Sequence, residues 1–130
     1  MIKRFFKWIK ENIFNIKPIF KIKIEASWFS DDYVCIKFSN DNGHRWYVIT
    51  TSENDIDENR WCKLKVATRY IRIEDVEDFI KYNNIETYEG CCKLVSKVYD
   101  EVEKHNKVAY ENYLNRTEPA REFIKKFNKK

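Results

Sequence analysis

The chain has 130 residues and a formal net charge of +4; 43% of its residues are hydrophobic, 16% aromatic and 35% charged. This length and apolar content predict one domain with a substantial core, and they exclude a disordered chain. No apolar run is long enough to cross a membrane and no signal-peptide pattern is present, so a cytoplasmic protein is expected.

Residues 1 to 16 predict a basic amphipathic helix that ends before Pro18. Its apolar side chains, including Phe5, Phe6 and Ile9, recur at spacings of three and four, and lysines and an arginine surround them. Such a helix either docks on a sheet or lies on an anionic membrane surface. Docking is favoured, because apolar residues continue from the helix toward the next predicted strand.

Residues 19 to 70 show the period-two alternation of β-strands. Four strands are expected, and they follow one another as an antiparallel meander: Ile19 to Phe29, Tyr33 to Ser39, His44 to Thr50 and Trp61 to Tyr70. With helices on either side in sequence, the fold class is α+β, with one sheet covered on one face by helices. The expected core comprises Trp28, Val34, Ile36, Phe38, Trp46, Val48, Leu64 and Val98.

The connection between the second and third strands has a turn sequence, Asn40-Asp41-Asn42-Gly43. The spacing Ser39-x-Asp41-x-Gly43-x-x-Trp46 resembles the Asp-box, a hairpin motif of sialidase-type propeller blades that also occurs singly in other folds. The resemblance implies that Asp41 holds the turn, Gly43 supplies a positive φ and Trp46 packs beneath the hairpin. Arg45 stands where the motif usually has threonine. A single copy implies no glycosidase activity.

The outer face of the expected sheet is rich in lysine. Five lysines, with Tyr47 beside them, form a candidate face for nucleic acid or an acidic partner: Lys21, Lys23, Lys37, Lys63 and Lys65. Lysines grip phosphates while tyrosines stack on bases in sheet-based single-strand binders. Lysine is also the ordinary solvated residue of an exposed sheet face, and the signature of an RNA-recognition motif is absent.

Residues 73 to 130 are expected to be helical. A short helix spans Ile73 to Tyr82 and stops at Asn83-Asn84, and Thr87 caps a long helix that runs to about Leu114. Its outer residues Tyr110, Tyr113 and Leu114 need a partner. Either a second helix that restarts at Pro119 folds back with Phe123, Ile124 and Phe127, or another chain packs there, so monomer and homodimer both remain open.

Motifs for catalysis and cofactor binding are absent from the sequence. The four cysteines form no CxxC pair, and neither His44 nor His105 lies near a cysteine pair, so packing thiols are expected and no metal or cofactor is. The carboxylates of the middle segment fit solvated or capping groups. We therefore expect a protein without enzymatic activity.

In composition and size the chain resembles small accessory proteins of low-GC phages and mobile elements, including anti-CRISPR inhibitors. That resemblance implies binding to a host protein or nucleoprotein complex, such as a host defence complex, without catalysis. Single-stranded nucleic-acid binding through the lysines is the second expectation, and membrane association through the N-terminal helix is the third.

Overall fold

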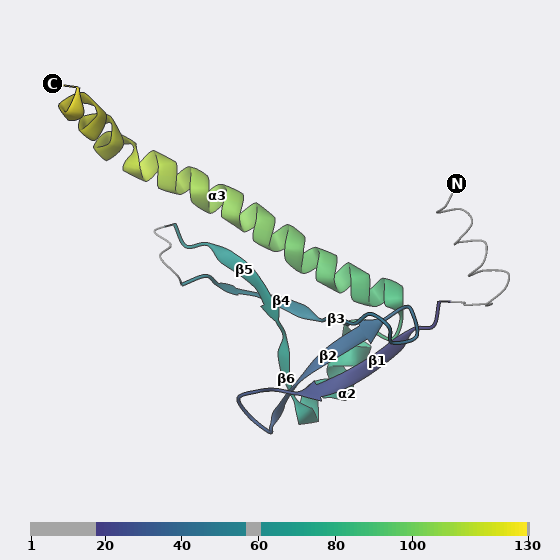
Figure 1. Ribbon diagram of the computed structural model, residues 1–130. Coiled ribbons are helices and arrows are strands. Elements are labelled where there is room, and N and C mark those ends of the chain that lie inside the picture. The colour runs from purple at the N-terminus through teal and green to yellow at the C-terminus, as the bar shows by residue number, and fades with distance from the viewer. Residues whose placement is uncertain (1–17, 57–60, 130) are drawn as a thin grey trace, which may run out of the picture. The chain divides into compact units, whose positions relative to one another are not determined.

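The computed structural model describes residues 18–56 and 61–129, which form α+β structure with antiparallel sheets and a long C-terminal helix, as the sequence predicts (Figure 1). The chain divides into two compact units. The described residues of the first unit are 18–49 and 69–92, and those of the second are 50–56, 61–68 and 93–129. The predicted N-terminal helix over residues 1 to 16 lies outside the described residues.

The first unit is built around the central strand of a four-stranded sheet. This strand, β2, pairs along one edge with β1, and its other edge is shared by β3 and β6. All three pairings are antiparallel. The strands are β1 (Lys21–Ala26), β2 (Tyr33–Ser39), β3 (Tyr47–Val48) and β6 (Tyr70–Arg72).

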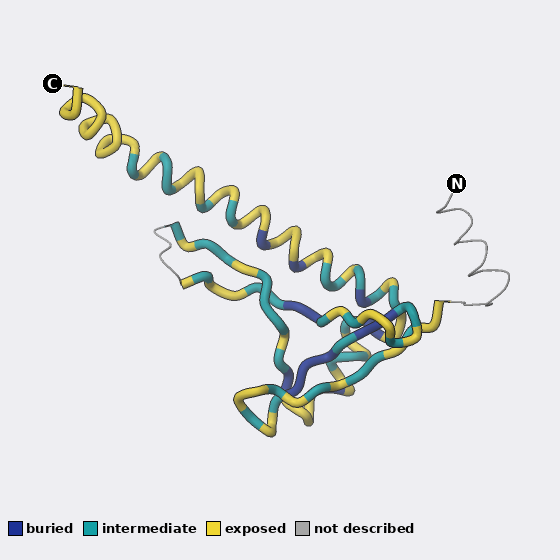
Figure 2. The backbone as a smooth tube through the Cα atoms, in the orientation of Figure 1, coloured by how far each residue is buried: buried dark blue, intermediate teal, exposed yellow. Residues whose placement is uncertain are grey.

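The core of the first unit lies against the apolar face of β2, which is dark blue along most of its length in Figure 2. Ile36 in β2 is fully buried, as are Ile49 and Ile85. The helical cover comes from the short 3-10 helix η1 (Ile73–Asp75), α2 (Val76–Tyr82) and the first turn of α3 (Tyr88–Asn128). Complete burial of an isoleucine side chain contributes about 1.5–3 kcal/mol, so Ile36 anchors this unit.

The second unit contains a two-stranded antiparallel sheet and most of α3. The strands are β4 (Thr50–Asn54) and β5 (Leu64–Thr68). On α3 in this unit, Val98 and Val102 are buried, whereas the C-terminal part of the helix is exposed (Figure 2). One helix therefore has very different surroundings along its length.

The expected single meander of four strands is wrong, because residues 18–56 and 61–129 form six strands in two sheets. The predicted third strand divides at Ile49 and the predicted fourth strand divides at Arg69. Ile49 N–H donates to the Ile36 carbonyl at 2.9 Å, and Arg69 N–H donates to the Ile49 carbonyl at 3.0 Å. Alternation continues through both positions, but the pairing partner changes there, and only tertiary structure decides that change.

The register of β3 also corrects the expected core. Tyr47 pairs with Phe38 and Val48 pairs with Lys37, so Tyr47 lies on the Phe38 face and Val48 on the lysine face. A shift of one residue exchanges the two faces of a strand. Accordingly Val48 is only half-buried, and the adjacent Ile49 is buried in its place.

Some of the other expected core residues are buried and some are not. Burial is confirmed for Val34, Ile36, Phe38 and Val98. Trp46 and Leu64 are half-buried, and Trp28, which belongs to the loop after β1, is 86% exposed. The predicted first strand reached Phe29, but β1 ends at Ala26, so Trp28 no longer follows the strand's alternation.

The connection between α2 and α3 has the predicted capping residues. Asn84 adopts a positive φ of 55°, which ends the preceding helix. Thr87 Oγ1 accepts a hydrogen bond from the Gly90 N–H at 3.1 Å, as expected of an N-cap. Gly90 also has a steric role, because a Cβ added there would lie 1.8 Å from the Asn84 carbonyl oxygen.

Candidate protein-binding surface

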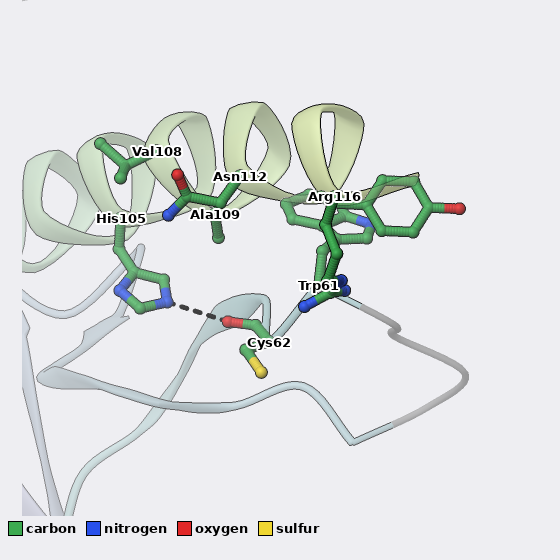
Figure 3. Close-up of a pocket in the computed structure, with 8 residues that line it drawn as sticks. Trp61, Cys62, His105, Val108, Ala109, Asn112 and Arg116 are labelled. Atoms are coloured by element: carbon green, nitrogen blue, oxygen red, sulfur yellow. Dashed lines mark hydrogen bonds between the residues drawn. The ribbon is translucent and has the colours of Figure 1, made fainter. Parts of the chain in front are cut away.

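The middle of α3 holds the start of β5 through side chain to backbone hydrogen bonds. Asn106 Oδ1 accepts from the Leu64 N–H at 2.8 Å, and Asn106 Nδ2 donates to the Leu64 carbonyl at 2.9 Å. His105 Nε2 lies 2.9 Å from the Cys62 carbonyl oxygen (Figure 3). A carbonyl only accepts, so this nitrogen carries the proton. Together these bonds fix residues 62–64 on the helix.

Cys62 interrupts the predicted fourth strand because its φ is 52°. This value lies in the left-handed region, which residues other than glycine rarely adopt. The turn brings Trp61 against α3. The Trp61 ring meets Tyr110 edge to face at a centroid distance of 5.3 Å, and Tyr110 stacks on Tyr113 at 6.4 Å. Tyr110 and Tyr113, predicted to need a partner, therefore have one within the second unit.

An open cavity of about 260 Å³ lies beside this aromatic cluster (Figure 3). It is smaller than most small-molecule sites, which occupy roughly 300–1,000 Å³. Arg116 lies over the Tyr113 ring at 5.9 Å. The lining residues are Trp61, Cys62, His105, Val108, Ala109, Asn112, Tyr113 and Arg116.

Beyond this cluster α3 continues through Pro119, which corrects the expected restart and fold-back of a separate helix. Proline has no N–H, so the carbonyl of Asn115, four residues earlier, loses its usual helical donor. Neighbouring side chains bond carbonyls in the same turn. Arg121 Nη2 donates to the Leu114 carbonyl at 2.7 Å, and Thr117 Oγ1 donates to a carbonyl one turn back at 2.8 Å. Leu114, the third predicted binding residue, is half-buried.

We name residues 115–129 the outer arm. Its three large apolar side chains are exposed, at 68% for Phe123, 56% for Ile124 and 66% for Phe127. Phe123 and Phe127 stack on each other at a centroid distance of 6.1 Å. In the sequence these residues were one candidate for an internal cap, but the structure leaves them facing solvent.

The outer arm continues a stripe that is buried at the start of the same helix. Cys91, Val102, Tyr113 and Ile124 recur every eleven residues, which is about three helical turns, so each lies on nearly the same face as the one before it. Their exposure rises along the helix. Cys91 is 0% exposed, Val102 9%, Tyr113 intermediate and Ile124 56%. This eleven-residue repeat is the signal in the sequence that points to the outer arm.

The polar side of the outer arm is predominantly basic. It carries five basic and two acidic side chains, a net charge of +3. The acidic residues are Glu118 and Glu122, and the basic ones are Arg116, Arg121, Lys125, Lys126 and Lys129. Exposed phenylalanines flanked by cations are suited to an apolar groove with an acidic rim.

The structure does not bring the predicted lysine face together on one sheet. Lys21, Lys23 and Lys37 share one face of the first unit's sheet, since Lys23 pairs with Lys37 in register. Lys63 and Lys65 belong to the second unit, where Lys65 pairs with Glu53 at 3.5 Å.

The lysines of the first unit are partly neutralised by Glu25. Its carboxylate lies 2.7 Å from Lys37 Nζ and 3.1 Å from Lys23 Nζ. Hydrogen bonds from Lys37 and then Lys23 lower the pKa of Glu25, and the Glu25 carboxylate raises the pKa of Lys37. Lys23 also lies over the Trp46 ring, with Nζ 4.4 Å from its centroid. Lys23 and Lys37 are therefore paired within this face.

The turn that resembles an Asp-box is organised by side chain to backbone hydrogen bonds. Asp41 Oδ1 accepts from the Arg45 N–H at 2.8 Å and from Ser39 Oγ at 2.7 Å. Both hydrogen bonds lower the pKa of Asp41, and the bond from the Arg45 N–H has the larger effect. Gly43 has a φ of 88°, and a Cβ there would lie 3.2 Å from the Trp46 ring. The hydrogen bonds of Asp41 and Ser39 thus lie within the turn itself.

In residues 18–56 and 61–129, no three histidine, cysteine or acidic side chains gather as a metal site. Over the same part of the chain, no helix combines the length and the apolar character needed to cross a membrane. Comparisons of the chain with protein-family models, with curated proteins and with solved structures give no match.

Proposed function

We propose that this chain is a non-catalytic protein-binding module whose outer arm inserts into a groove on another protein. The observation that carries the proposal is the rise in exposure along the stripe from Cys91, at 0%, to Ile124, at 56%. Within a monomer an apolar stripe is normally covered along its whole length. A helix that presents an apolar face to solvent matches the helix-in-groove mode of recognition.

The binding residues of this proposal are Phe123, Ile124 and Phe127. Large aromatic side chains dominate binding energy when they enter a desolvated pocket. Full burial of each contributes about 1.5–3 kcal/mol before the costs of association. The basic flanks require an acidic rim on the partner. A host protein or nucleoprotein complex, inhibited by occupation of its surface, is the class of partner that we propose.

The test uses the full chain and a variant that keeps the helix but removes the rings, Phe123→Ala with Phe127→Ala. A captured protein is first identified and purified, and its affinity for both forms is then measured by titration calorimetry. We expect a one-to-one complex with the intact chain and an affinity at least about a hundredfold lower for the variant, because hot-spot truncations cost 2 kcal/mol or more.

Tyr99→Ala is the matched control, since Tyr99 is an aromatic residue of the same helix and is 57% exposed. It should bind like the intact chain. Equal binding by the double variant and the intact chain would remove the outer arm as the binding site, and a matching loss in the Tyr99 variant would show that the effect is not specific to the arm.

A further inference from the structure

A second exposed apolar surface lies at one end of the four-stranded sheet of the first unit. Trp28 is 86% exposed, Ile73 54% and Phe29 48%. The Phe29 ring contacts Trp28 edge to face at 5.5 Å and Tyr70 at 4.9 Å. Ile73 N–H donates to the Asp32 carbonyl at 3.0 Å, which joins the β1–β2 loop to the start of η1. We name residues 27–33 and 70–75 the Trp28 surface.

The Trp28 surface is acidic around its aromatic residues. Its four acidic side chains and one basic side chain give a net charge of −3, and all five residues are exposed: Asp31, Asp32, Arg72, Glu74 and Asp75. Arg72 has local partners, because its Nε donates to the Tyr33 hydroxyl at 3.1 Å and its Nη1 lies 4.0 Å from Glu74. The unbalanced charge of this surface is therefore negative.

We propose that the Trp28 surface of one copy of this chain binds the outer arm of a second copy. This inference rests on the proposed function of the outer arm, and it gives the same arm a further partner, a second copy of this chain. The net charges of the two surfaces are −3 and +3, and each surface presents large exposed apolar side chains beside those charges. Pairing of two outer arms is disfavoured, because it brings +3 against +3.

The spacing of the aromatic rings is compatible in the two surfaces. Phe123 and Phe127 lie 6.1 Å apart on the outer arm, and Trp28 and Phe29 lie 5.5 Å apart on the Trp28 surface. Aromatic pairs favour centroid separations of 4.5–7 Å. Two neighbouring rings of one surface can therefore each meet a ring of the other.

The contact joins two different surfaces of identical chains. Each copy offers one arm and one Trp28 surface, so every copy can provide either side of the contact. Charges at exposed rims act through a Debye length of about 8 Å at physiological salt. Self-association should accordingly weaken as salt concentration rises.

The experiment measures the mass of the full chain by sedimentation equilibrium over a range of protein and salt concentrations. Two charge-reversal variants are compared with the unchanged chain. The arm variant carries Lys125→Glu with Lys126→Glu, and the surface variant carries Asp31→Lys with Asp32→Lys. Each variant alone should associate at least about tenfold more weakly, because like charges then face each other. An equimolar mixture should recover association, since each altered surface finds an opposite one.

Two further variants test the apolar part and keep the test independent of charge. Trp28→Ala should weaken association, while Tyr82→Ala, at an aromatic residue that is 88% exposed elsewhere in the first unit, should not. Circular dichroism of every variant confirms that the fold is retained. Loss of association in each reversed variant, with recovery in the mixture, supports the proposal.

Three results would overturn the inference. The first is a chain that stays monomeric at every concentration up to about 0.1 mM, where even a weak specific contact should appear. The second is association that the Asp31 and Asp32 changes leave unaffected, and the third is a mixture of the two variants that does not recover association. The proposed function is judged separately. A chain that stays monomeric but still loses its captured partner on Phe123→Ala with Phe127→Ala keeps the binding arm and loses only the second copy as its occupant.

Discussion

Gly90→Ala should destabilise this protein, although the same change in most helices is stabilising. Glycine inside a helix costs about 1 kcal/mol relative to alanine, so helix propensity alone predicts a gain. At this position the added Cβ would lie 1.8 Å from the carbonyl oxygen of Asn84 and 2.9 Å from its carbonyl carbon. Both atoms belong to the backbone, so no side chain rotation relieves the contact.

The magnitude follows from the displacement required. The contact must lengthen from 1.8 Å to at least 3.0 Å, a shift of 1.2 Å. Asn84 has a φ of 55° and follows directly on α2, so it cannot move alone. Backbone shifts forced by overpacking cost roughly 3 kcal/mol at the upper end of their usual range. Subtracting the propensity gain of about 1 kcal/mol leaves a net loss of about 2 kcal/mol.

Urea denaturation followed by circular dichroism measures this loss as a lower midpoint at an unchanged slope. The melting temperature should fall by roughly 5 to 10 °C for a chain of this size. Ser96→Ala, an exposed position on the same helix, is the control and should be neutral or stabilising by a few tenths of a kcal/mol. A Gly90→Ala protein as stable as the unchanged chain would refute the steric argument.

Three other predictions concern single side chains. Asn106→Ala should cost about 1–3 kcal/mol of unfolding free energy, because both backbone groups of Leu64 lose their partner; denaturation measures it. The pKa of Asp41 is lowered in the folded protein, so the stability that its carboxylate contributes is complete above the ordinary pKa of 3.8 and is lost as pH falls through the lower folded-state pKa. In a pH series of melting temperatures, this loss appears as an acid limb, a fall in melting temperature at low pH. Asp41→Asn should flatten that limb. A thiol reagent should label exposed Cys62 first, whereas burial raises the pKa of Cys91 to about 11 and should delay its labelling until unfolding.

Each of these predictions has a contrary outcome. Asn112→Ala, at an exposed residue of the same helix, should change the unfolding free energy by less than about 0.5 kcal/mol. An equally small effect of Asn106→Ala would contradict the stabilising role of its two hydrogen bonds with Leu64. An acid limb as steep in Asp41→Asn as in the unchanged chain would contradict the role of the Asp41 carboxylate in the turn. Labelling of Cys91 as fast as Cys62 in the folded protein would contradict its burial.

Local patterns in the sequence were sufficient for the elements that depend on near neighbours. The Asn40–Gly43 turn, the strand Tyr33–Ser39 and the Thr87 cap all rest on residues a few positions apart. Turn chemistry, alternation and capping act over that range, so one sequence is enough to predict them. The α+β class follows for the same reason.

Pairing partners and register required the tertiary structure. The residues on either side of Ile49 alternate without interruption, yet β3 pairs with β2 and β4 pairs with β5. Because alternation specifies two faces but not which face is buried, Tyr47 and Val48 were assigned to the wrong sides. The lysine face was divided because the strand that carries Lys65 pairs with β4 in the second sheet and not with β2.

In the outer arm, too, the sequence determines the helical stripe and the tertiary structure determines whether that stripe is exposed. The spacing of Tyr113, Phe123, Ile124 and Phe127 already determined that they share one stripe of a helix. Whether that stripe continues past Pro119 or folds back is not given by the spacing, and the structure shows that α3 continues through Pro119. The hydrogen bonds of Thr117 and Arg121 with carbonyls of the preceding turns exist only in the folded chain. Side-chain periodicity is thus a property of the sequence, whereas exposure is a property of what the rest of the chain covers.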